Sequence, residues 1–186
     1  MVADERTDLG GTVLLARVSG SLRAQGLPGI PIGLVASVPA FLAPTTSWVR
    51  GRVGFGLVLL AVQYGVVMSG RRYGYRRRVA AAVPAPPLAS FETADETQRR
   101  VRRRYRWVNV ASLLALAIFG FITHLPVGAG LVGFGAALLT RAALLRWWEN
   151  RHGMLVWGIA VTGELRLRDP VHQFYLTAAR TGEQRV

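Results

Sequence analysis

Glu149 and His152 are the residues whose types and spacing come closest to a metal-binding motif. They stand three positions apart, which puts a carboxylate and an imidazole on one face of a helix. Carboxylate-bridged iron sites use two such pairs together with further inward-facing glutamates, and this sequence has no second Glu-x-x-His pair. We therefore interpret Glu149 and His152 as a solvated pair at a membrane surface, and we predict no metal site.

Nucleotide binding is the second chemistry that a short motif suggests. Residues 128–133 read Gly-Ala-Gly-Leu-Val-Gly, the spacing of a dinucleotide-binding loop. That loop works where a strand turns into a helix whose N-terminus holds the pyrophosphate, whereas here the motif lies inside an apolar segment. The chain also has no cysteine, no Gly-x-Ser-x-Gly elbow, no His-Glu-x-x-His motif and no P-loop. We therefore predict a protein that is not an enzyme and that binds no cofactor.

The strongest chemical feature is a concentration of arginine. The sequence has 23 arginines and no lysine, and 11 of the arginines lie between residues 71 and 106. The arginines that we assign to contact with anionic lipid or with an acidic partner are Arg71, Arg72, Arg76, Arg77, Arg78, Arg99, Arg100, Arg102, Arg103 and Arg104. Each arginine near an anionic leaflet contributes about 1 kcal/mol. Tyr73 and Tyr75 stand among them, so stacking on nucleic-acid bases is a weaker alternative.

Long uncharged segments flank these arginines on both sides. Residues 24–49, 53–70 and 107–140 contain no charged side chain. A helix needs about 20 apolar residues to cross the ~30 Å hydrocarbon layer, so the first two segments fit one crossing each and the third fits two short ones. Pro126 and Gly128 provide a break near the middle of the third segment. The sequence therefore predicts four transmembrane helices.

The predicted fold class is an all-α membrane protein whose four transmembrane helices form two antiparallel hairpins. Residues 28–70 form the first hairpin, and Pro39 is expected to kink its first helix in mid-span. Residues 107–148 form the second hairpin. The short connections within each pair favour this arrangement.

Three segments outside the hairpins complete the predicted organisation. Residues 1–27 form an N-terminal arm, either an amphipathic helix on the membrane surface or a disordered segment. Residues 71–106 form the arginine-rich central loop, which becomes helical from Thr93 because acids precede arginines there, as the helix dipole favours. Residues 149–186 form a small tail, read either as a β-hairpin with strands at 154–161 and 164–168 or as an interfacial continuation of the last helix.

The distribution of arginine predicts the orientation in the membrane. With both termini inside, 21 arginines face the cytoplasm and only Arg50 and Arg52 lie outside, as the positive-inside rule requires. Arg141 and Arg146 are expected to reach the headgroups by extending their stems. The composition, rich in Ala, Gly, Val and Arg, suggests a bacterial source. We therefore predict a multi-pass protein of the bacterial plasma (inner) membrane with both termini cytoplasmic.

Small residues at helical spacing predict where helices approach closely. Ala129, Gly133 and Ala137 recur every four positions, and Gly65 and Ser69 form a shorter stripe. Such stripes allow close contact between helices in a membrane. Packing within one chain is the preferred interpretation, and packing between copies is the alternative.

The function predicted from these features is that of an accessory or scaffold subunit. It would bind anionic lipid headgroups or an acidic partner through the central arginines, and it would pack against another membrane protein or a second copy. One alternative is a small transport or channel component, active as an oligomer, with a path lined by Gln63, Asn109, Ser112 and backbone freed around Pro39. A membrane-tethered nucleic-acid-binding protein is another, and a lipid-modifying enzyme lacks a candidate catalytic set.

Overall fold

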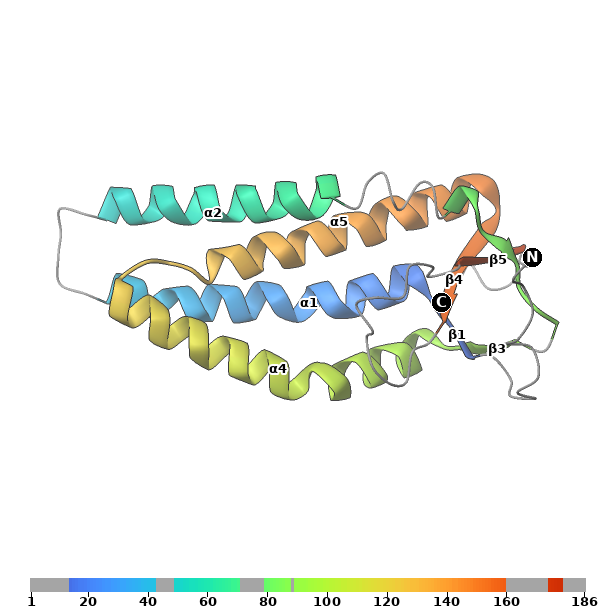
Figure 1. The fold of residues 1–186 in the computed structure, drawn as a ribbon, viewed down its shortest axis with the longest axis horizontal. Coiled ribbons are helices and arrows are strands. Elements are labelled where there is room, and N and C mark those ends of the chain that lie inside the picture. The colour runs from blue at the N-terminus through green and yellow to red at the C-terminus, as the bar shows by residue number, and fades with distance from the viewer. Residues whose placement is uncertain (1–13, 43–48, 71–78, 88, 160–173, 179–186) are drawn as a thin grey trace, which may run out of the picture.

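The computed structural model spans the 186-residue chain and describes residues 14–42, 49–70, 79–87, 89–159 and 174–178. These residues form four long helices with a small sheet at one end of them (Figure 1). All four helices are long and apolar enough to cross a membrane. The prediction of four helices of membrane-spanning length is therefore confirmed.

The elements occur in the following ranges. The helices are α1 (Val18–Ser37), which continues as the 3₁₀ helix η1 (Val38–Phe41), α2 (Val49–Gly70), α4 (Ala94–Thr123) and α5 (Ala129–His152). The strands are β1 (Leu14–Arg17), β2 (Val83–Pro84), β3 (Ser90–Glu92), β4 (Met154–Ile159) and β5 (Phe174–Ala178).

The four helices lie in a row rather than in a square bundle. α1 and α4 start at the sheet and run away from it, whereas α2 and α5 run back towards it (Figure 1). α1 packs against both α5 and α4, and α2 packs against α5. The order across the row is therefore α2, α5, α1 and α4. The main contacts join the two halves of the chain, so the described helices do not pack as the two separate hairpins that we expected.

The first helix begins ten residues earlier than predicted. α1 starts at Val18 and includes Pro28 and Pro31 in its interior, because membrane helices tolerate proline where neighbouring groups satisfy the freed carbonyls. Pro39 lies at the end of the helix and not in mid-span, since α1 ends at Ser37 and Pro39 occupies the first turn of η1. Because the helix starts early, Pro39 falls in the 3₁₀ turn at its end and not in the middle of the span.

The sheet is the largest departure from the predicted all-α fold. Its strand order is β2-β5-β4-β1-β3, with β1 parallel to β3 and antiparallel to β4. Part of the N-terminal segment that we read as an amphipathic helix or a disordered arm is thus a sheet strand. The pattern Leu14-Leu15-Ala16-Arg17 is too short to distinguish a strand from a helical turn by periodicity. Leu15, Leu155 and Trp157 form the buried core of the sheet.

The C-terminal tail contains strands, as one of the two readings predicted. β4 and β5 pair antiparallel, with Val156 opposite Leu176. The expected second strand at residues 164–168 lies outside the described residues. The chain reverses into β4 at Gly153, whose φ of 61° ends α5 in the left-handed conformation, as is common for glycine at a helix C-terminus.

α4 is one continuous helix of 30 residues that joins the sheet to the apolar segment. Thr93 and Glu96 form a capping box at its N-terminus: the Glu96 N–H bonds to Thr93 Oγ1 at 3.3 Å, and the Thr93 N–H bonds to Glu96 Oε2 at 2.9 Å. Asp95 and Glu96 in the first turn also favour the helix dipole. At the other end His124 has a φ of 54° and precedes the turn into α5, where the sequence predicted a break.

Candidate functional site

The end of the row that carries the sheet contains two buried glutamates, each paired with an arginine. Glu149, in the last turn of α5, is 1% exposed. Its Oε2 accepts hydrogen bonds from Arg17 Nη2 at 3.0 Å and from Ser19 Oγ at 3.4 Å. Its Oε1 accepts one from the Val156 N–H at 3.0 Å. One carboxylate therefore connects the end of α5 to the start of α1 and the start of β4.

The sequence interpretation of Glu149 and His152 as a solvated pair is wrong. His152 is exposed, its Nδ1 lies 2.9 Å from the Trp148 carbonyl oxygen, and its ring stacks on Trp148 with centroids 4.3 Å apart. Glu149 is buried instead, because Arg17 at the end of β1 lies against it. The sequence analysis did not predict this strand. No group of three or more His, Asp or Glu side chains among the described residues is placed to hold a metal ion.

A second glutamate is held in the same way on β3. Glu92 is 8% exposed and receives two bonds from Arg100, from Nε to Oε1 and from Nη2 to Oε2, both at 2.8 Å. The Thr97 hydroxyl donates to the same carboxylate at 2.9 Å. This bidentate pair attaches β3 to the first turns of α4. Glu92 and Glu149 therefore join the sheet to α4, α1 and α5.

Two pKa values at the start of α4, before its apolar half, follow from these contacts. The pKa of Glu96 is lowered, mainly because its carboxylate accepts the Thr93 N–H and hydroxyl bonds of the capping box. The pKa of Arg100 is raised, mainly because Glu92 accepts its hydrogen bonds. Both groups are thus held in their charged forms by partners inside the chain.

The predicted arginine contacts divide into three groups. Arg71, Arg72, Arg76, Arg77 and Arg78 lie outside the described residues. Arg99, Arg102, Arg103 and Arg104 have exposed side chains on the first half of α4. Arg100 differs from its neighbours because it is committed to Glu92. Of the predicted lipid or partner contacts, Arg100 is therefore better described as a structural residue.

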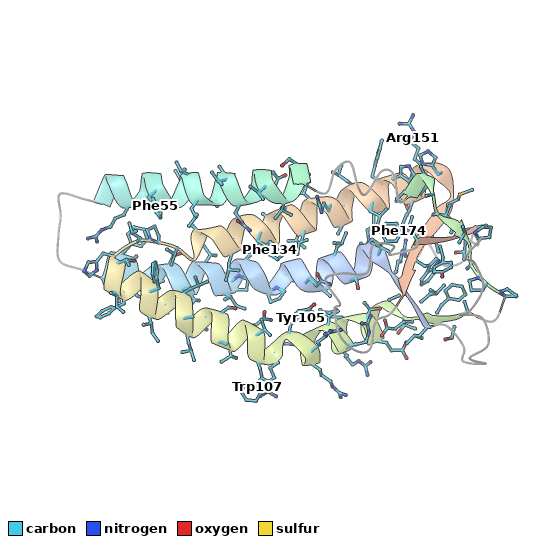
Figure 2. All side chains as sticks on the ribbon, viewed as in Figure 1. Phe55, Tyr105, Trp107, Phe134, Arg151 and Phe174 are labelled. Carbon is cyan, nitrogen blue, oxygen red and sulfur yellow. The ribbon has the colours of Figure 1, made fainter. Side chains whose placement is uncertain are left out.

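Three of the exposed arginines, Arg99, Arg102 and Arg103, lie on the side of α4 opposite its buried residues. Thr97 and Val101 are buried on the inner side. Trp107 is 74% exposed and projects outward, whereas Tyr105 lies on the side that faces α1 (Figure 2). The Arg106 guanidinium lies 5.6 Å from the centre of the Trp107 ring, a cation–π contact. The outer face thus passes directly from arginine to a large aromatic side chain.

α5 carries a smaller basic and aromatic patch near the sheet. Arg146 and Trp147 are exposed, and Arg151 lies 5.4 Å from the centre of the Trp147 ring. Arg151 projects away from the row (Figure 2). Such amphipathic side chains are typical of membrane–water interfaces.

Two arginines that the sequence assigned to the solvent or the headgroups instead bind helix ends. Arg141 of α5 donates to the carbonyl oxygens of Val67 and Met68 in the last turn of α2. Arg141 thus binds the end of a neighbouring helix, and its extension to the headgroups stays a prediction. At the far end Arg52, 9% exposed, donates to the Ala40 carbonyl in η1 at 3.0 Å. Carbonyls at helix ends lack an intrahelical partner, so both arginines satisfy groups that would otherwise be unpaired.

The small residues of α5 lie against α2. A Cβ added at Gly133 would lie 2.3 Å from the Leu60 carbonyl oxygen, and one added at Gly56 would lie 3.7 Å from Cβ of Ala129. Ala137 is fully buried. This close contact is what allows the two helices to pack in parallel along their length.

The small residues Gly65 and Ser69 of α2 do not face α5. A Cβ added at Gly65 would meet no heavy atom of the described chain within 4 Å, and Ser69 is exposed, with its hydroxyl donating to the Val66 carbonyl. Gly65 and Ser69 therefore take no part in the contact between α2 and α5, and packing between copies or with a partner is the interpretation that remains for them.

The sequence did not reveal the close contact between α1 and α5. Gly26 and Gly33 of α1 face Gly135 of α5 and Gly128, which precedes α5, and an added Cβ would come within 2.9 Å of the opposite backbone. The signal was present as glycines at positions 26, 29 and 33 of α1. It was obscured because the prolines at positions 28 and 31 displaced the expected start of the helix.

The comparisons with known proteins identify no family for this chain. No protein-family model matches the chain, and no curated protein and no solved structure shows significant similarity to it.

Proposed function

We propose that the protein is a non-catalytic accessory or scaffold subunit of a membrane complex, which binds anionic lipid or an acidic partner through its arginine-rich segment. The observation that carries this proposal is the outer face of α4, where exposed arginines lead directly into exposed apolar side chains. The two buried glutamates support a structural role for the sheet end, because both are fully engaged by arginines of the same chain.

The proposed site of assembly is the uncovered face of α2. This helix packs against α5 on one side, and on the other side Gly65 and Ser69 are exposed together with Val58 and Val62. A face of small and β-branched residues permits close approach of another transmembrane helix. We place the contact with the partner membrane protein, or with a second copy, on this face.

The transport alternative requires more than one chain. Gln63 is on α2 and Asn109 is on α4, and α5 and α1 lie between these helices (Figure 1). A path lined by both side chains would therefore have to form between copies. The nucleic-acid alternative rests on residues 71–78, which lie outside the described residues, and on the same arginines of α4.

Affinity purification of the tagged full-length protein from its native cells in mild detergent tests the proposal. We expect a partner protein at stoichiometric amount and co-purifying anionic lipid, both measured by mass spectrometry. G65L should remove the protein partner without unfolding the chain, because the position is open. V58L on the same face is the matched comparison and should weaken partner recovery less than G65L, since it replaces one exposed apolar side chain with another. Recovery of the protein without any second protein would contradict the accessory-subunit role and favour transport by an oligomer.

A further inference from the structure

We propose that the outer face of α4 binds the phosphates of anionic lipid headgroups in the leaflet next to the sheet, through Arg103 and Arg106 beside Trp107. This inference rests on the proposed function, and it names lipid rather than an acidic protein as the ligand of these arginines. The level at which the membrane surface crosses α4 decides which arginines reach the headgroups.

One face of α4 changes from arginine to apolar residues without a break. Arg99, Arg103, Arg106, Val110 and Leu114 follow one another at intervals of three or four residues, so they share one helix face. Val110 is 43% and Leu114 57% exposed. If the apolar half of this face contacts acyl chains, the arginine half must emerge into the headgroup layer directly above it.

On the neighbouring helix α1, the last charged residue lies at the same depth as on α4. Gly120 of α4 lies beside Ala36 of α1, since an added Cβ would be 3.5 Å from the Ala36 carbonyl oxygen. The two helices run in the same direction (Figure 1). Arg23 precedes this contact by 13 residues and Arg106 precedes it by 14, and each is the last charged residue before a long uncharged segment. Two helices therefore place the boundary of the hydrocarbon layer at the same level.

The rise of the helix then separates the arginines by depth. At about 1.5 Å per residue, Arg106 lies about 1.5 Å, Arg103 about 6 Å and Arg99 about 12 Å beyond Trp107. The headgroup layer is roughly 5–8 Å thick on each side of the hydrocarbon. Arg103 and Arg106 thus lie within this layer, and Arg99 lies beyond it.

The charges around these arginines favour the same assignment. Glu96 acts electrostatically on Arg99, whereas the sequence contains no acidic residue from position 97 to position 148. Arg106 and Arg103 are therefore free of nearby acids along the helix, and their charge is available to a phosphate. A soluble acidic partner would have easier access to Arg99 than to Arg106, because Arg99 stands further from the bilayer.

Native mass spectrometry of the purified full-length protein tests the assignment, by titration with phosphatidylglycerol and with phosphatidylcholine of the same acyl chains. We expect R106Q to weaken phosphatidylglycerol binding about fivefold, which corresponds to about 1 kcal/mol for one arginine, and R103Q to do the same. R99Q is the matched control, with the same charge change on the same face, and should change binding less than twofold. R106K should bind phosphatidylglycerol about as well as the wild-type protein, because a phosphate also accepts hydrogen bonds from lysine.

Three results would overturn the inference. R99Q could weaken binding as much as R106Q, which would indicate a diffuse electrostatic field or a ligand further from the membrane. Soluble glycerol phosphate could displace the lipid at equal concentration, which would identify a free phosphate as the ligand. The wild-type protein could bind both lipids equally. If a stoichiometric protein partner still co-purifies in any of these cases, the accessory-subunit proposal survives with an acidic partner in place of lipid.

Discussion

At the scale of single residues, Glu149 holds the junction between the sheet and the helices. Its carboxylate is buried and accepts bonds from Arg17, Ser19 and the Val156 N–H. Removing one partner of a buried ion pair leaves the other charge without compensation. We expect E149A to lower the free energy of unfolding by about 3 kcal/mol, measured by denaturant titration in detergent micelles. H152A should change it by less than about 0.5 kcal/mol, because His152 is exposed, and equal losses in the two variants would contradict this account.

Arg100 and Arg99 provide a second test at this scale. They are adjacent in sequence, yet Arg100 binds the buried Glu92 at 2.8 Å through two nitrogens, and Arg99 is exposed. We expect R100Q to lower the unfolding free energy by roughly 2–3 kcal/mol and R99Q to have almost no effect. The double variant E92Q/R100Q should be more stable than R100Q alone, since it also removes the buried charge. A double variant that loses the sum of both single effects would contradict a direct interaction.

At the scale of elements, the contact between α5 and α2 depends on Gly133. An added Cβ there would lie 2.3 Å from the Leu60 carbonyl oxygen, so a side chain at this position must separate the helices. We expect G133L to lower the melting temperature in detergent by several degrees and to expose α2 to proteolysis. G65L makes the same substitution on α2, where no described atom lies within 4 Å, and should leave both measurements unchanged. Similar losses in the two variants would mean that the helices do not pack in this order.

The sequence predicted elements best where the signal is long. The four predicted membrane-length helices, the break at Pro126 and the helix from Thr93 through the arginines all correspond to elements of the structure. The sheet was missed in part because its strands are two to six residues long and come from three distant segments. Short strands carry little periodicity, and pairing between distant segments leaves no local signal. The burial of Glu149 was missed for the same reason, since Arg17 reaches Glu149 only through β1.

At the scale of the whole molecule, the row of helices brings the sheet and the basic half of α4 to the same end (Figure 1). α1 and α4 leave the sheet, α2 and α5 return to it, and β1 to β5 are built from the segments that precede, separate and follow the helices. This arrangement is what the arginine distribution predicted for one side of a membrane. The side itself is a prediction from the positive-inside rule.

We expect the sheet end to lie in the cytoplasm and the turn after α4 to lie outside, and labelling of single cysteines distinguishes the two sides. The chain has no cysteine, so each substitution introduces the only thiol. Ser90 is exposed on the sheet, and Thr123 is at the far end of α4. With a membrane-impermeant maleimide, we expect T123C to be labelled in intact cells and S90C only after permeabilisation. Labelling of S90C in intact cells, with T123C protected, would contradict the account.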